Sequence, residues 1–149
     1  YGAGHFINGL TVTGNVFRNI HGSIDRIEAV DTSFADLNYN RMRNVTFSDN
    51  MFTPVEVGAV NPLVKRHDEN THAKTWVIDC APFLPFGGWA QTVESVLAFG
   101  AIKETDKTNH HAMPYVSPKE GTTKDQLHVV WQNEVKGSVI VRARMDNAL

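Results

Sequence analysis

Five acidic side chains lie between residues 25 and 49 and could, as a pair, cleave a glycosidic bond: Asp25, Glu28, Asp31, Asp36 and Asp49. Such cleavage needs two carboxyl groups that flank the bond, roughly 5–10 Å apart. Asp31 and Asp49 hold equivalent places in two related stretches of sequence, so stacking of these stretches would bring the carboxylates together. Asp is also a common turn former, because its side chain bonds to the nearby backbone. We favour the turn role and keep Asp31 and Asp49 as the catalytic candidates of an alternative interpretation.

Two further groups of side chains could do chemistry, with a less specific pattern. A lyase acting on a uronate needs a basic or phenolic side chain, and Tyr39, Arg41 and Arg43 cluster, but a solvated loop explains them equally well. The histidines match no established spacing of metal ligands, and adjacent histidines in a strand point to opposite faces. We therefore expect the following side chains to bind no metal and no cofactor: His67, Asp68, His72, His110 and His111.

Three tryptophans could stack on sugar rings, because an aromatic face suits the apolar C–H face of a pyranose. Trp131 shares one face of its strand with apolar neighbours, which predicts a core position, and Trp76 lies in a strand-like stretch. Trp89 follows two glycines in a loop and is the better candidate for glycan binding. Packing in the core is the favoured alternative for Trp89 as well.

The elements that must position these residues begin with an eleven-residue phrase that occurs twice, at 10–20 and 45–55. Val12 aligns with Phe47, Asn15 with Asn50, and Phe17 with Phe52. A degenerate third copy, at 27–37, places Phe34 in the same column, which gives a spacing of 17 or 18 residues. A short fixed period is typical of a repeat fold whose copies stack to bury their apolar faces.

Each copy has the pattern of a strand, an Asn or Asp turn, and a second short strand. This pattern predicts coils of a parallel β-helix, with Phe17, Phe34 and Phe52 in one interior column and Asn15 above Asn50 in a turn ladder. A series of ordinary β-hairpins is the alternative.

The chain after residue 60 predicts a compact antiparallel β domain, because short strands alternate with Pro- and Gly-containing turns. We expect a connecting loop at 65–72, a packed loop at 81–88, and strand rather than helix at 93–103. The clearest hairpin closes the chain, with its turn at Asn133-Glu134. On the last strand, one face carries the residues Val139, Val141, Ala143 and Met145.

Composition excludes several classes of partner. A formal net charge of −2 gives no reason to expect nucleic acid or an anionic membrane as a partner. The sequence contains no apolar run of 18 residues, so no membrane-spanning helix is predicted. The single cysteine, Cys80, has apolar flanks and is expected to be a buried thiol. The first residues look like the inside of an earlier coil, so we expect a fragment of a larger chain.

Parts of both halves of the sequence resemble known protein families. Gly14-Asn-Val-Phe-Arg-Asn19 is similar to coils of pectate-lyase-like right-handed parallel β-helices. The stretches 83–96, 113–116 and 135–147 look like the C-terminal part of bacteriophage tailspike proteins. The resemblance implies a homotrimer on the virion tail, whose C-terminal sandwich caps the β-helix and recognises host surface polysaccharide. It supplies no catalytic residue that can be transferred.

We therefore expect an all-β chain: terminal coils of a parallel β-helix at 1–60, then an antiparallel β-sandwich at 61–149, assembled as a trimer. The expected function is capping and trimerisation, without catalysis by this fragment of a polysaccharide-degrading parent. Arg142 and Arg144 would pair with acids across the seam or lie at its rim. The alternatives are the catalytic end of a polysaccharide lyase or glycoside hydrolase, or a monomeric carbohydrate-binding module.

Overall fold

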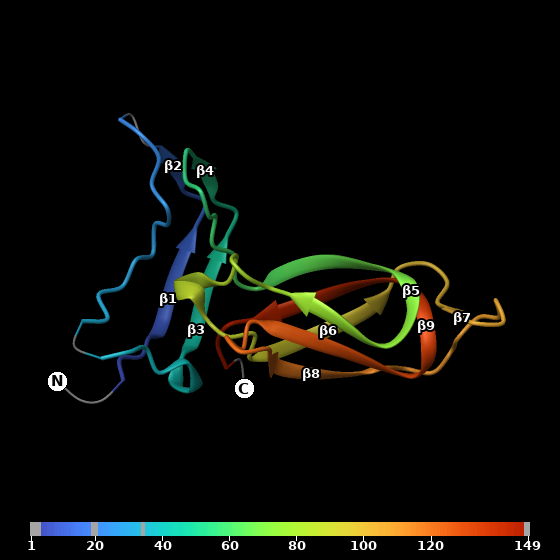
Figure 1. The fold of residues 1–149 in the computed structure, drawn as a ribbon. Helices are drawn as coiled ribbons and strands as arrows, with labels where there is room; N and C mark the ends of the chain where they lie inside the picture. The colour runs from blue at the N-terminus through green and yellow to red at the C-terminus, as the bar shows by residue number, and fades with distance from the viewer. Residues whose placement is uncertain (1–3, 19–20, 34, 148–149) are drawn as a thin grey trace.

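The computed structural model describes residues 4–18, 21–33 and 35–147 (Figure 1). Nine strands are joined by turns and loops, and the helical content of this part of the chain consists of two 3-10 turns, η1 (Tyr39–Arg41) and η2 (Pro85–Gly87). The predicted all-β class is confirmed.

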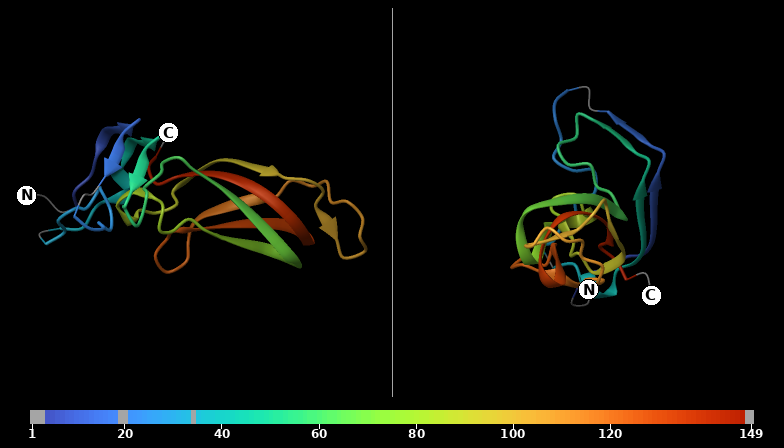
Figure 2. Two further views of the ribbon diagram at one scale, coloured as in Figure 1. Left: turned by 90° about the horizontal axis from the view of Figure 1, so that it is seen from above. Right: turned by 90° about the vertical axis from the view of Figure 1, so that its right-hand side faces the viewer.

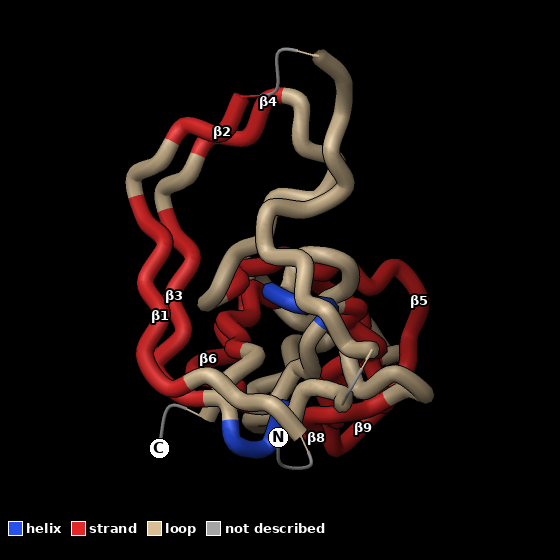
Figure 3. The backbone as a smooth tube through the Cα atoms, turned by 90° about the vertical axis from the view of Figure 1, so that its left-hand side faces the viewer, coloured by secondary structure: helices blue, strands red, loops and turns tan. Residues whose placement is uncertain are grey.

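The two copies of the repeated phrase form parallel ribbons. β1 (Asn8–Thr13) pairs with β3 (Arg43–Ser48), and β2 (Val16–Arg18) pairs with β4 (Met51–Thr53). Val12 lies opposite Phe47, as the alignment of the two phrases requires. Figure 3 shows β1 beside β3 and β2 beside β4, with loop segments along the other side. Parallel pairing rules out the alternative of β-hairpins for this part of the chain.

The paired copies of the phrase lie further apart in the sequence than the expected period. Asn15 and Asn50 contact each other across 35 residues, and no strand forms in the described part of the middle copy, 27–37. The expected spacing of 17 or 18 residues is therefore wrong for the stacking repeat. The middle copy lacks strict alternation and contains the turn-forming Asp31, so it serves as connection between the ribbons. Phe34, predicted to join the interior column, lies outside the described residues.

The second half is one five-stranded antiparallel sheet, where two stacked sheets were expected. β9 (Gln126–Arg144) pairs along one edge with β5 (Leu63–Asp79). Its other edge pairs in succession with three short strands: β8 (Tyr115–Glu120), β7 (Lys103–Glu104) and β6 (Thr92–Ala98). Figure 2 shows this twisted sheet at one end of the molecule and the parallel ribbons at the other. The described part of this half is therefore a single sheet built around the long strand β9, without the second sheet of a sandwich.

Two local predictions in this half are wrong. The expected hairpin turn at Asn133-Glu134 is continuous strand in β9, and the expected loop at 65–72 belongs to β5. Both stretches are polar, but the β5–β9 ladder satisfies their backbone groups and charges pair locally, as in Arg66–Asp68. The predicted strand at 93–103 is confirmed over the range of β6.

A register shift lets β5 change its buried face midway. Leu63 is buried near the start of the strand, whereas Trp76 and Ile78 are buried near its end, so the inward parity switches from odd to even. The shift lies between Glu69 and Thr75. A bulge of this kind bends a long strand and increases its twist, which allows β5 to follow β9 around the core.

The core lies against one face of β9. The predicted face of the last strand is confirmed, since four alternate side chains are buried: Val139, Val141, Ala143 and Met145. Trp131 is also buried, as predicted, and packs on Trp76 with ring centroids 4.9 Å apart. Cys80 is buried, also as predicted, and burial raises the pKa of its thiol to about 11.

Candidate functional site

The outer edge of β3 is closed by residues from the antiparallel half. The backbone N–H of Val45 donates to Asp146 Oδ2 at 3.0 Å, and its carbonyl accepts from Asn61 Nδ2 and from Arg144, the latter at 2.9 Å. Phe47 exchanges two backbone hydrogen bonds of 3.0 Å with Asn61. These backbone groups of β3 point away from β1, so another parallel strand has no free groups to pair with at Val45 and Phe47.

Asp146 is the centre of this closure. Its side chain is fully buried and also accepts hydrogen bonds from Asn61 Nδ2 and Arg144 Nε, each at 2.9 Å. Burial raises the pKa of the carboxyl group, but the hydrogen bonds from Arg144, Val45 and Asn61 outweigh it, so the net pKa is lowered. Asp146 is therefore held as a carboxylate that ties β9 to the last parallel strand.

The turn between the parallel strands forms the predicted Asn ladder. Asn50 Oδ1 accepts from the backbone N–H of Asn15 at 3.0 Å, and Asn50 Nδ2 donates to the Val12 carbonyl at 2.8 Å. The rings of Phe17 and Phe52 stack with centroids 5.4 Å apart and planes 9° apart. The opposite edge of β1 pairs with no described strand. The ribbon is thus closed on the β3 side and open on the β1 side.

The two catalytic candidates do not come together as a stacked pair. The turn at Asp49 stacks on the turn at Gly14, whose N–H donates to the Ser48 carbonyl at 3.2 Å. Asp31 lies in the connecting segment, where Ser33 donates its backbone N–H to the carboxylate at 2.9 Å. Hydrogen bonding from Ser33 lowers the pKa of Asp31, which is the opposite of what a general acid requires. Asp49 has a left-handed backbone, with φ of 56°, as a turn former does.

The lyase-base cluster is likewise engaged in structure. The Tyr39 hydroxyl donates to the Phe86 carbonyl at 2.8 Å, and burial raises the pKa of this phenol. The guanidinium of Arg41 lies 3.7 Å from the ring centroid of Phe6. A phenol whose pKa is raised is protonated near neutral pH, so Tyr39 is a poor base for proton abstraction.

The glycan candidate, Trp89, is half-buried between an aromatic ring and two cations. Its ring lies 5.4 Å from that of Tyr39, while Lys124 Nζ and Lys119 Nζ lie 4.1 Å and 5.7 Å from its centroid. At Gly88, which precedes it, an added Cβ would lie 2.9 Å from the backbone carbonyl oxygen of Pro85. Lys124 is exposed, and a sugar that binds the indole face would displace its ammonium group. Trp89 as a glycan contact stays a prediction.

The paired histidines point to different environments, as predicted. His110 is buried and His111 is exposed. His110 Nδ1 lies 2.8 Å from Glu104 Oε1, and its ring packs edge-on against Trp131 with centroids 5.6 Å apart. His110 is thus part of the wall of the core, where a surface or seam position was expected. Among the residues that the structure describes, no three metal-binding side chains converge.

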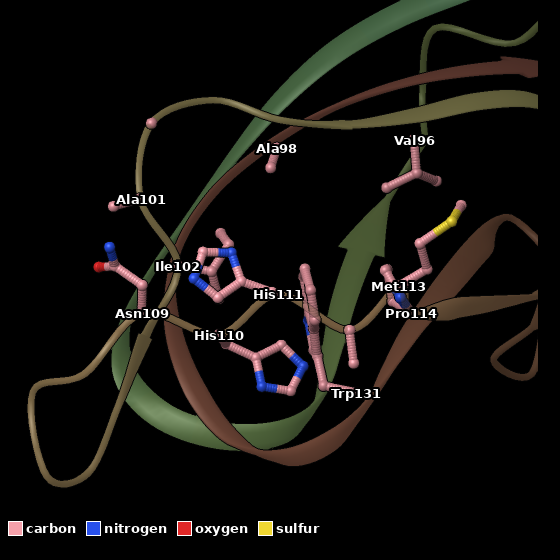
Figure 4. A pocket seen from close by; sticks show the side chains of 12 residues that line it. Val96, Ala98, Ala101, Ile102, Asn109, His110, His111, Met113, Pro114 and Trp131 are labelled. Carbon is pink, nitrogen blue, oxygen red and sulfur yellow. The ribbon is translucent and has the colours of Figure 1, made fainter.

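A cavity of about 460 Å³ opens between β6 and the segment 109–114, and Figure 4 shows the side chains around it. β6 contributes Val96 and Ala98, and Trp131 contributes from β9. The lining contains no Asp, Glu, Lys or Arg. Met113 lines this cavity and is 90% exposed, whereas Leu97 and Phe99 alternate with Val96 and Ala98 along the chain and are not part of the lining.

Sequence reasoning missed both the closing residues and this cavity. Asn61 precedes a proline and resembles a turn residue, and Asp146 follows the last strand, so each has the pattern of a chain break rather than of a buried contact. Arg144 was expected at a subunit seam, whereas it pairs with Glu94 and Asp146 of its own chain. The feature of the sequence that could have indicated this contact is the alternation of arginine with apolar residues at the end of β9.

Comparison of the chain with protein-family models, curated proteins and solved structures finds no match. Within the described ranges, no helix has the length and apolar character needed to cross a bilayer. Three features of the structure bear on function: the closure of the parallel ribbon, the Trp89 cluster and the cavity beside β6.

Proposed function

We propose that this chain is the C-terminal capping and trimerisation part of a bacteriophage tailspike, which recognises host surface polysaccharide from the exterior of the virion tail. The observation that carries the proposal is the closure of β3. Asn61, Arg144 and Asp146 occupy the backbone groups on which a further parallel coil would pair. A segment that blocks one edge of a stack and leaves the other edge free is a terminal cap.

The repeated Asn and Phe positions next to the open edge of β1 support a stack of coils that continues on that side only. Asn15 repeats the position of Asn50, and Phe17 repeats that of Phe52, so a coil added beside β1 would meet the same pattern again. A parallel β-helix grows by such repetition, and its last coil needs a cover for its unpaired groups and apolar interior.

Self-association is supported by apolar surface that one chain leaves uncovered. Leu97 is 65% exposed and Met113 is 90% exposed, although each has apolar neighbours with which a partner chain could pack. Obligate interfaces are apolar and bury on the order of 2,000 Å² or more. In the proposed trimer, three chains cover this surface around one axis.

The role in polysaccharide recognition has one structural support, the half-buried indole of Trp89 beside two lysines. This cluster suits a sugar ring, with an anionic substituent near the ammonium groups. Cleavage of the polysaccharide is assigned to other parts of the parent, because Asp31 and Asp49 both lie in turns. A monomeric carbohydrate-binding module is the second candidate function, and it depends on the same cluster.

Size-exclusion chromatography with light scattering tests the proposal. The expected result is a mass three times 16.6 kDa. A mass of 16.6 kDa with retained affinity for capsular or O-antigen polysaccharide would favour the binding module. Turnover of those polysaccharides by the purified chain would instead favour the enzyme.

A further inference from the structure

The end of β8 and the turn before β9 hold two lysines against the ring of Trp89. Lys124 Nζ lies 4.1 Å from the centroid of the indole and Lys119 Nζ lies 5.7 Å from it. Both ammonium groups are within the distance of roughly 6 Å at which an aromatic face attracts a cation. The ion pairs between described side chains include neither lysine. A ligand on the indole therefore meets positive charge that no described carboxylate neutralises by direct contact.

The backbone fixes both lysines beside the ring. The Lys119 N–H donates to the Ala90 carbonyl, and the Ala90 N–H donates to the Lys124 carbonyl, each at 2.9 Å. Because Ala90 follows Trp89, these two bonds hold the turn next to the indole. Both lysines have a left-handed backbone, with φ of 57° and 59°, which is uncommon for residues other than Gly, Asn and Asp. Backbone outliers of this kind cluster at ligand-binding sites.

The two ammonium groups are held in different ways. Lys119 Nζ donates to Asn40 Oδ1 at 3.1 Å, which keeps it at the edge of the cluster. Lys124 is exposed, and its ammonium group has no hydrogen-bond partner in the described part of the chain. At 4.1 Å from the ring centroid, this group occupies the space that a stacked sugar ring needs. Lys119 can therefore keep its place when a sugar binds, whereas Lys124 must move.

Displacement of Lys124 separates acidic sugars from neutral ones. A neutral sugar removes the cation–π contact and gives the ammonium group no new partner, which lowers its affinity roughly two- to fivefold. A sugar with a carboxylate offers the displaced ammonium group an ion pair of similar strength, and the same carboxylate attracts Lys119. Binding sites commonly obtain specificity from such a penalty on the wrong ligand.

We propose that the Trp89 cluster selects acidic sugars, with Lys124 as the residue that disfavours neutral ones and Lys119 as the residue that attracts the carboxylate. The ligand class is a polysaccharide with uronate residues, one of which stacks on the indole. This inference rests on the proposed role in polysaccharide recognition, and it names the ligand class and the residues that determine specificity.

Calorimetric titration with a matched pair of oligosaccharides tests the selection. The probe is a fragment of a uronate-containing capsular polysaccharide, used in its native form and after reduction of its carboxyl groups to neutral alcohols. Wild type should bind the acidic form more tightly. Lys124→Gln should bind the reduced fragment roughly two- to fivefold more tightly than wild type does, and the acidic fragment within about twofold of wild type. Lys119→Gln should lose about threefold in affinity for the acidic fragment alone.

Lys107→Gln is the matched control for both variants. Lys107 is exposed and also has a left-handed backbone, with φ of 73°, but it lies in the turn that follows β7. The substitution removes the same charge from the same backbone conformation at a different place. We expect it to leave the affinity for both fragments unchanged, and an effect equal to that of Lys124→Gln would refute the assignment.

The outcomes separate this inference from the proposed function. Equal affinity of wild type for the acidic and reduced fragments overturns the selection and leaves polysaccharide recognition standing. The same holds if Lys124→Gln gains nothing on the reduced fragment, or if the chain retains neutral polysaccharides alone. Absence of binding to every capsular and O-antigen polysaccharide tested overturns the recognition itself and the selection with it.

Discussion

Replacing Asp146 by Ala should strongly destabilise the fold, because this carboxylate joins the two halves of the chain. It is fully buried and accepts from the Val45 backbone, from Asn61 and from Arg144. Its removal leaves the partly buried guanidinium of Arg144 and two N–H groups without their acceptor. Breaking a buried charge pair costs about 3–5 kcal/mol of unfolding free energy. Because Arg144 is partly exposed, we expect a loss at the lower end, about 3 kcal/mol.

Denaturant unfolding at one fixed protein concentration measures this loss, since assembly makes stability concentration-dependent. Glu134→Ala is the control, because it removes an exposed carboxylate from β9, the strand that Asp146 follows. Asp146→Asn keeps one acceptor oxygen and should fall between the control and Asp146→Ala. If Asp146→Ala unfolds at the same denaturant concentration as Glu134→Ala, the closure of β3 by this residue does not hold the halves together.

The pH dependence has a definite sign at the same residue. The pKa of Asp146 is lowered in the folded chain, since its hydrogen bonds outweigh burial, so the unfolded chain binds the proton more tightly. The stabilisation is therefore complete above the ordinary carboxyl pKa near 3.8 and is lost as pH falls through that value towards the folded pKa. Wild type should lose more stability than Asp146→Asn between about pH 5 and 3. Equal losses in the two chains would contradict this linkage.

Three further predictions address the ladder, the glycan candidate and the turns. Phe52→Ala should cost about 2 kcal/mol in denaturant unfolding, less than for a fully buried ring, because Phe52 is half-buried on Phe17; an unchanged midpoint would refute the stacking contribution. Trp89→Ala should abolish retention on a polysaccharide affinity column under conditions where the variant remains folded, and equal retention would remove Trp89 from the site. Asp49→Asn should leave folding and assembly intact, and any glycan cleavage that disappears in this variant would favour the enzyme instead.

The local sequence pattern predicted the structure correctly where the strand alternation and the turn residues repeat together. The alignment of Val12 with Phe47 and of Asn15 with Asn50 predicted the parallel register and the hydrogen-bonded turn, because both follow from period-two alternation and Asn turn chemistry. The 35-residue separation of the paired copies could not be derived from this pattern, since the middle copy shares residue types with the strands but lacks their alternation.

Long-range contacts explain the other differences. Polar residues at 65–72 and at Asn133-Glu134 have the composition of loops, yet pairing between β5 and β9 satisfies their backbone and makes them strand. The roles of Asn61 and Asp146 depend on partners 16 to 101 residues away, which no local signal encodes. Leu97 and Met113 are recognisable in the sequence only as apolar residues, and their exposure follows from the arrangement of the strands.

Sedimentation equilibrium of the unaltered chain at low micromolar concentration tests the proposed self-assembling cap most directly. An obligate interface should keep the chains together at that concentration, so the expected mass is three times 16.6 kDa, with one cooperative unfolding transition. A folded and stable species of 16.6 kDa would contradict the proposal and leave the monomeric carbohydrate-binding module as the better description.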